Sequence, residues 1–245
     1  MTRVIFAVIL VTFAWGQSFE VASIRLHKTP VQGIGVTLSG PRFTAAAMSL
    51  DNLIVNAYSL QSYQVSGVPA WGSSNHSDCD RYDINAKAEG DGTLLRDKSK
   101  KMLQALLGER FHLQFHYETK NLPVYNLVIA KGGHKLKLSP PDAESMLMSG
   151  GSGVGIEMTV TKGNMTQLVT QFSNNYGVNR PVLDKTQLTG NYDYALTWTL
   201  DAEARGIDPE AVSIALEKQL GLKLESNKAP IQLLVIDHVE KPSEN

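Results

Sequence analysis

Two stretches of the chain share one pattern of apolar and polar positions. Residues 101–131 fit a helix ending in Leu-Gly, an alternating strand, a turn closed by Pro123 and a strongly apolar strand. Residues 215–238 repeat this order, with Pro230 at the matching turn. A helix buries residues with a period of 3.6, whereas a strand alternates with a period of two. The repeated order predicts an internal duplication.

The segments that precede each stretch also correspond. A Tyr-Asp strand begins near Arg81 and another near Asn191, and an apolar helix is predicted after Ser49 and after Asn164. Ser and Asn are common N-caps, and Gln167 stands in the capping-box position relative to Asn164. We therefore expect an α+β protein of two related modules, each a small, mainly antiparallel sheet covered by two helices.

Turn-forming residues suggest where the modules meet. The segment 138–153 contains Pro140-Pro141 and the run Gly150-Gly151-Ser152-Gly153, which favour irregular structure. We expect an N-terminal α+β module over 17–137, a Pro/Gly/Ser-rich linker over 138–153, a C-terminal α+β module over 154–240 and a loose tail over 241–245.

The first sixteen residues have the order of a secretory signal. Arg3 is followed by an apolar run and then by small residues up to Gly16, where we expect cleavage. The run is shorter than the roughly 20 residues of a membrane-spanning helix, and we expect no span in the mature chain. We predict export to the periplasm or the extracellular space.

The charge of the mature chain is nearly neutral. Loss of Arg3 leaves 22 of the 23 basic residues against 24 acidic ones. A nucleic-acid-binding surface needs a basic excess, so no nucleic-acid partner is expected. Cys79 is the single cysteine, which excludes an internal disulfide.

Candidate chemistry is sparse. His112 and His116 lie four residues apart, but on a strand that spacing separates them by about 13 Å, too far for one metal ion. The loop before Arg81 holds His76 and Cys79, with Trp71 expected to attach it to the core, but it offers no evident base and oxyanion hole. We predict no catalytic residue, metal or cofactor, and keep His76 and Trp71 as surface or ligand candidates.

The recurring Tyr-Asp pairs are the other candidates. Tyr82 with Asp83, and Tyr192 with Asp193, stand at corresponding places. They could mark paired ligand sites. They could equally be structural, with each tyrosine filling a core edge and each aspartate capping a turn.

Several phrases of the sequence resemble an uncharacterised family of exported bacterial proteins, a domain of unknown function expanded in soil bacteria of the acidobacterial kind. They include RFTAAAMSLDNLIVNAYSL, DRYDINAKAEG and QLLVIDHVEKPSEN. Some members resemble fusions to a sensor-type membrane metallopeptidase, which implies periplasmic sensing or binding. More weakly, the segment from Phe43 to Val65 is similar to the short N-terminal domain of secretins and TonB-dependent receptors, a protein-contact module.

These observations favour a binding, protein-interaction or sensing module that acts outside the cytoplasm on an unidentified protein or small-molecule partner. The sequence leaves two alternatives open. One is a hydrolase whose active-site residues are dispersed along the chain and converge only in the fold. The other is a structural component of the envelope. An enzyme is the less favoured reading.

Overall fold

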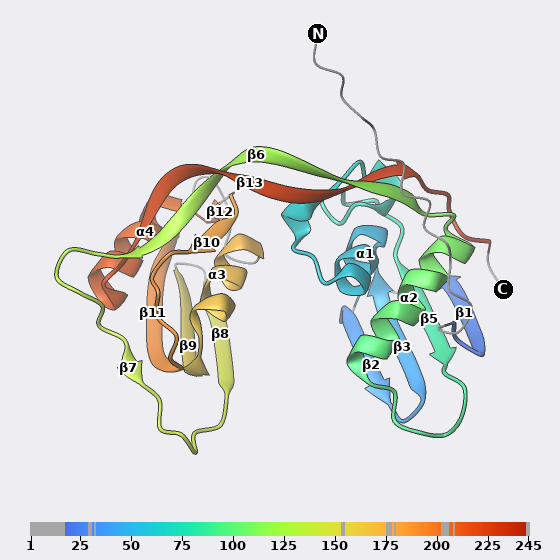
Figure 1. The fold of residues 1–245 in the computed structure, drawn as a ribbon, viewed down its shortest axis with the longest axis horizontal. Helices are drawn as coiled ribbons and strands as arrows, with labels where there is room; N and C mark the ends of the chain where they lie inside the picture. Colours follow the sequence, from blue (N-terminus) through green and yellow to red (C-terminus); the bar gives the residue numbers. More distant parts are fainter. Residues whose placement is uncertain are drawn as a thin grey trace, which may run out of the picture. The chain divides into compact units, whose positions relative to one another are not determined.

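The computed structural model describes residues 18–28, 31, 33–152, 155–174, 178, 180–201, 206–207 and 209–243. These residues form mostly β-strands, arranged in two four-stranded sheets and one five-stranded sheet, with short helices (Figure 1). The chain divides into two compact units. Unit 1 holds the described residues up to Leu60, Val65–His116 and those from Leu234 onward, and unit 2 holds Gln61–Gln64 and Tyr117–Leu233.

Unit 1 contains an antiparallel sheet in the order β1-β5-β3-β2. Its strands are β1 (Val21–Leu26), β2 (Gly35–Ser39), β3 (Arg42–Met48) and β5 (Tyr82–Lys87). Its helices are α1 (Leu50–Tyr58), α2 (Arg96–Arg110) and the single 3₁₀ turn η2 (Ala70–Gly72). The 3₁₀ turn η1 (Ser62–Gln64) leads into the short strand β4 (Val65–Ser66).

Periodic apolar residues build the core of unit 1. Along β3, Phe43 and Ala45 are buried two residues apart, as expected for a strand with one face inward. Along α1 the buried residues follow helical spacing and form one stripe. They are Leu50, Leu53, Ile54 and Ala57. The helix ends at Ser59, whose left-handed backbone (φ 56°) is a common helix stop.

Unit 2 contains the five-stranded sheet, in the order β12-β11-β9-β8, with β7 also paired to β11. The strands are β7 (Lys137–Leu138), β8 (Met146–Ser152), β9 (Gly155–Gly163), β11 (Tyr192–Asp201) and β12 (Gly206–Ile207). The helices are α3 (Met165–Asn174), α4 (Pro209–Ala215) and the π-helical turn η3 (Leu216–Leu220).

Local signals set the helix ends of unit 2. Asn164 and Gln167 form the predicted capping box, in which each side chain accepts a hydrogen bond from the backbone N–H of the other residue (2.9 and 3.0 Å). Gly221 ends η3 with φ 65°, and a Cβ there would lie 2.3 Å from the Gly133 carbonyl oxygen. Only glycine fits this position.

The third sheet has the order β10-β6-β13-β4. Its two central strands are long, β6 (Gln114–Ile129) and β13 (Leu222–His238), and β10 (Val182–Asp184) is short. They run side by side, and each contributes residues to both units (Figure 1). The outer strands β10 and β4 pair in parallel with β6 and β13 respectively.

The predicted fold class is wrong. The structure is mostly β in three sheets, rather than α+β with two modules that each have a small antiparallel sheet covered by two helices. Pro123 and Pro230 lie inside β6 and β13 instead of closing turns. A proline removes one donor, which a strand tolerates where that N–H is not needed by the ladder. The two proline-containing strands pair with one another in the third sheet, which has residues of both units.

Two smaller features also differ from expectation. Helix α2 continues past Gly108 to Arg110, and the fully buried Phe111 follows it. Strand β8 occupies part of the segment 138–153, where the sequence indicates a linker. In the segment 241–245, predicted to be loose, Lys241 pairs with Asp80 at 2.7 Å, and residues 244–245 lie outside the described part of the chain.

The predicted signal segment, 1–16, lies outside the described residues. Among the helices that the structure describes, none combines the length and the apolar character needed to cross a membrane.

Candidate functional site

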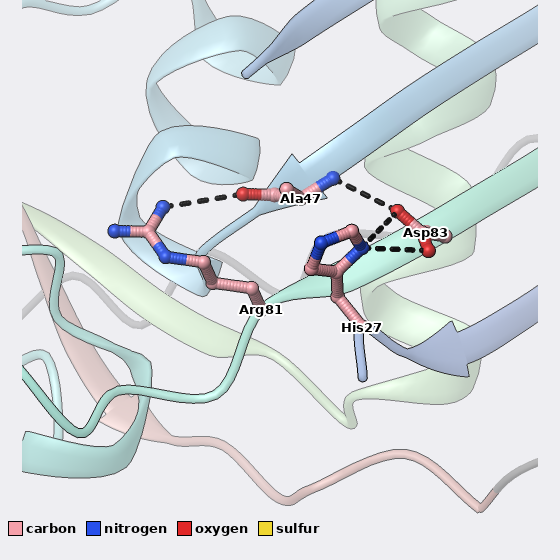
Figure 2. Close-up of polar contacts among 4 residues, drawn as sticks. All are labelled: His27, Ala47, Arg81 and Asp83. Atoms are coloured by element: carbon pink, nitrogen blue, oxygen red, sulfur yellow. Dashed lines mark hydrogen bonds and ion pairs between the residues drawn. The ribbon is translucent and has the colours of Figure 1, made fainter. Parts of the chain in front are cut away.

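Asp83 stands at the centre of a polar cluster in unit 1. Its carboxylate accepts a hydrogen bond from the Ala47 backbone N–H (2.9 Å), and its two oxygens lie 3.1 and 2.9 Å from Nδ1 of His27. Arg81 donates to the Ala47 carbonyl oxygen (3.2 Å), so that both backbone groups of Ala47 are held (Figure 2). The cluster fixes a register shift between β3 and β5, where Ala47 has a left-handed φ of 49°.

The surroundings of Asp83 favour its charged form. Burial raises the pKa of this carboxyl, but the hydrogen bonds from Ala47 and His27 and the charge of His27 outweigh burial, so the pKa lies below the ordinary value. The Asp83 carboxylate thus makes its hydrogen bonds with neighbouring residues of unit 1, which is a structural role.

Asp193 in unit 2, like Asp83 in unit 1, accepts a hydrogen bond from the backbone of a left-handed residue on the neighbouring strand. Its carboxylate accepts hydrogen bonds from the Ser139 hydroxyl and from the Lys162 backbone N–H (2.9 Å). These two bonds lower the pKa of Asp193, against an opposing effect of burial. Lys162, like Ala47, has a left-handed backbone (φ 55°) just before a helix, and the register between β9 and β11 also shifts here. Each aspartate therefore holds a backbone irregularity between a strand and a helix.

The two tyrosines are core residues. Tyr82 is 3% exposed and contacts the Phe111 ring edge to face, with centroids 5.3 Å apart. Burial, followed by the charge and hydrogen bond of Asp80, raises the pKa of Tyr82. Tyr192 is also buried, and its ring lies 5.9 Å from that of His134. Neither ring is presented to a ligand.

Trp71 attaches its loop to the core of unit 1, as expected. It packs against the buried cluster, and its carbonyl oxygen accepts a hydrogen bond from the Asp80 backbone N–H (2.6 Å). The Lys241 ammonium lies 5.6 Å from the centre of the Trp71 ring and also pairs with Asp80. His76 is exposed in the same loop, and its carbonyl oxygen accepts a hydrogen bond from the Cys79 N–H (3.3 Å).

The two histidines at 112 and 116 have different partners. His116, on β6, pairs with Asp237 at 2.8 Å, whereas His112 lies 4.0 Å from Glu240. Within the described part of the chain, no group of three or more histidine, cysteine, aspartate or glutamate side chains could hold a metal ion. The structure thus does not bring the sequence candidates together into one site.

A different surface stands out on strand β8 of unit 2. Three consecutive apolar residues are exposed there, Met146 by 49%, Leu147 by 42% and Met148 by 60%. The strand carries no charged residue and pairs with β9 at the end of the sheet. An edge strand leaves a row of main-chain N–H and C=O groups that can pair with another strand. β8 therefore offers both main-chain hydrogen bonds and apolar contact.

The opposite side of the same sheet is closed. There β11 pairs with β7 at one end and with β12 at the other. Between these pairs, the Gln219 side chain accepts from the Thr197 N–H (3.0 Å) and donates to the Thr197 carbonyl oxygen (2.6 Å). One amide thus replaces the partner strand at this residue, which satisfies the edge. β8 has no such cover among the described residues.

A groove of about 1000 Å³ lies beside β8. The residues lining it come from β8, β9, β11, α4 and η3, all within unit 2. They are mostly glycine, threonine and aliphatic residues, and Glu157 and Lys218 are its charged members. The residues that bear on the argument below are Met148, Gly150, Glu157, Thr197, Ile214 and Lys218.

Sequence reasoning missed this surface because the glycines and serines of 149–153 indicate a linker. A signal was present, however. Met146–Met148 is a short apolar run, and two residues including Gly153 separate the strands that end at Ser152 and begin at Gly155. Two-residue loops containing glycine are typical of β-hairpins.

Comparison with known proteins identifies a family but no described relative. No curated protein and no solved structure matches the chain. The similarity of Phe43 to Val65 to the secretin-type domain therefore stays a prediction. The family model described as protein of unknown function (DUF3738) matches residues 51–239. Because this match covers more than half of the chain, the protein belongs to the DUF3738 family.

Proposed function

We propose that this protein is exported and binds a partner protein outside the cytoplasm, by adding an extended segment of the partner to the edge of β8. The observation that carries the proposal is the exposed, uncharged and apolar edge strand of unit 2. Strand addition is a common mode of peptide recognition, in which main-chain hydrogen bonds supply affinity and alternate side chains supply specificity.

The contrast between the two sides of the sheet supports a binding role for β8. Proteins usually shield edge strands with charges, prolines, bulges or covering segments, since an open apolar edge promotes aggregation. The β11 side follows this rule through Gln219, β7 and β12. An edge left open beside a groove is best explained by a partner that covers it.

Export is supported by the first sixteen residues, whose charged, apolar and small-residue regions occur in the order of a signal sequence. It places the partner in the periplasm or outside the cell. The intact mass of the protein recovered from an envelope or culture fraction tests this point. Loss of the segment up to Gly16 is the expected result, and a mature protein that still begins with Met1 contradicts export.

The binding role is tested with an immobilised library of peptides about ten residues long, the upper end of ordinary strand length. The wild-type protein is expected to retain a subset of these peptides. Met148→Lys places a charge on the exposed edge and is expected to release them. Ile34→Lys, which changes an exposed apolar residue next to the edge strand β2, is the matched control and should bind like the wild type.

Two results would reject the binding role of β8. One is that the wild-type protein retains no peptide from the library. The other is that Met148→Lys binds the selected peptides as well as the wild type does.

A further inference from the structure

Three strands contribute a row of residues, opposite one another, to the groove beside β8. Gly150 on β8 stands opposite Glu157 on β9, which stands opposite Thr197 on β11. Residues directly opposite in neighbouring strands share one face of the sheet. A strand added outside β8 would continue this row: every second side chain would lie on the groove face of the sheet, and one of these would stand beside Gly150.

Because Gly150 has no side chain, the groove is open toward that added strand. A Cβ built on Gly150 meets no atom within 4 Å, and its backbone does not have a positive φ. The glycine is therefore not required by the backbone conformation. Its effect is to leave space at the edge of the groove, where a side chain of a bound segment can enter.

The groove suits an apolar side chain. Ile214 on α4 is 47% exposed and Met148 on β8 is 60% exposed, and both line it. Its charged residues, Glu157 and Lys218, have opposite signs, so the lining carries no net charge. An uncharged side chain that displaces water from Ile214 and Met148 gains from apolar burial, while an ionised one pays for lost hydration.

The segment before β8 has two exposed carboxylates, and the Lys162 ammonium donates a hydrogen bond to the Pro141 carbonyl oxygen (2.7 Å) beside them. Asp142 and Glu144 precede Met146 and are exposed. A segment that extends beyond Met146 meets these carboxylates, which favour a basic residue at that end through charge complementarity.

We propose that the segment bound by β8 has a bulky apolar side chain, such as Leu, Met or Phe, that enters the groove at Gly150, and a basic residue at the end near Glu144. This inference rests on the proposed function, because it specifies the chemistry of the same partner. An extended segment is the committed occupant, since the groove opens directly onto an edge that can form main-chain hydrogen bonds.

The first test is a paired peptide series. A library peptide that binds the wild type is compared with a version in which its bulky apolar residue is alanine, and the expected loss of affinity is about tenfold or more. Gly150→Leu fills the groove from within the protein. It is expected to weaken the bulky peptide about tenfold and to leave the alanine peptide nearly unchanged.

Gly35→Leu is the matched control for this variant. Gly35 also lies on an edge strand, β2 of unit 1, and a Cβ there likewise meets no atom within 4 Å. It should bind both peptides like the wild type. Equal affinity of the two peptides for the wild type, or an equal loss of both with Gly150→Leu, overturns the groove assignment while the edge proposal, tested by Met148→Lys, still stands.

The basic residue is tested with Glu144→Gln. Exposed ion pairs are weak, so a peptide with a terminal lysine should bind this variant about two- to fivefold less tightly, and added salt should remove the difference. No change at low salt overturns this part. Concentration-dependent self-association that Met148→Lys abolishes would assign the edge to a second copy of the chain and overturn the whole proposal.

Discussion

The Tyr-Asp strands and strand β8 differ in whether their side chains contact the protein itself or are exposed to solvent. In the former, Asp83 and Asp193 accept hydrogen bonds from backbone groups of their own sheets, and the tyrosine rings are buried. On β8, apolar side chains are exposed at an edge that ends the sheet. The recurring residues make their contacts within their own sheets. The outer edge of β8, by contrast, pairs with no other strand among the described residues.

This difference shows why repetition in a sequence is an unsafe guide to a ligand site. A bulge with a left-handed residue before a helix needs an acceptor for its N–H, and an aspartate on the neighbouring strand supplies it in both units. The same structural need therefore selects the same residue twice. The comparison can be tested by asking which changes cost stability and which cost binding.

The largest effect on stability is expected from removing a buried tyrosine. Tyr82→Ala should lower the free energy of unfolding by about 3–5 kcal/mol, since it leaves a cavity against Phe111. Tyr82→Phe keeps the ring and loses only a long hydrogen bond to Asp80 (3.4 Å), so it should cost about 1 kcal/mol or less. Denaturant unfolding measures both. An unchanged stability of Tyr82→Ala would remove the structural assignment of this residue.

A smaller, pH-dependent effect is expected at Asp83. Its pKa is lowered in the folded protein, so its contribution is complete above the unfolded value of about 3.9 and is lost as the pH falls through the folded value. Stability should therefore fall with acid less steeply in Asp83→Asn than in the wild type.

The unfolding free energy measured between about pH 7 and pH 2 tests this prediction. Asp193→Asn should change the acid dependence in the same direction, because the pKa of Asp193 is also lowered. Parallel pH curves for the wild type and both variants would show that these carboxylates do not stabilise the fold through their charge.

Part of the fold follows from local sequence signals. The capping box of Asn164 and Gln167, the stripe of α1 and the helix stop at Gly221 are all local, and the structure has each of them. The pairing of β6 with β13 joins segments about a hundred residues apart, and the period of a strand does not identify its partner. The sequence therefore did not show that the segments around Pro123 and Pro230 belong to two long paired strands, and the turns predicted at these prolines were wrong.

The candidate site on β8 could not be predicted from the sequence for a related reason. Met146 to Gly151 are all exposed, so this part of β8 lacks the alternation of buried and exposed residues by which a strand is recognised in a sequence. Gly150, a residue type that usually indicates a loop, here lies on a strand and leaves room beside the groove. Exposure of an apolar strand can be recognised only once its neighbours in the sheet are known.

The smallest effect on stability is expected at β8. Met148→Lys changes an exposed side chain, and the free energy of unfolding should stay within about 0.5 kcal/mol of the wild-type value. The same change is expected to abolish peptide binding. A marked loss of stability would mean that Met148 serves the fold, which would make β8 resemble the Tyr-Asp strands.

Amide hydrogen exchange of the protein with and without a selected library peptide tests the central claim most directly. The account predicts that bound peptide slows exchange within Met146–Ser152 and leaves the β5 amides of Tyr82–Lys87 unchanged, because new main-chain hydrogen bonds form only at the open edge. Unchanged exchange in β8, with protection elsewhere in the chain, would contradict it.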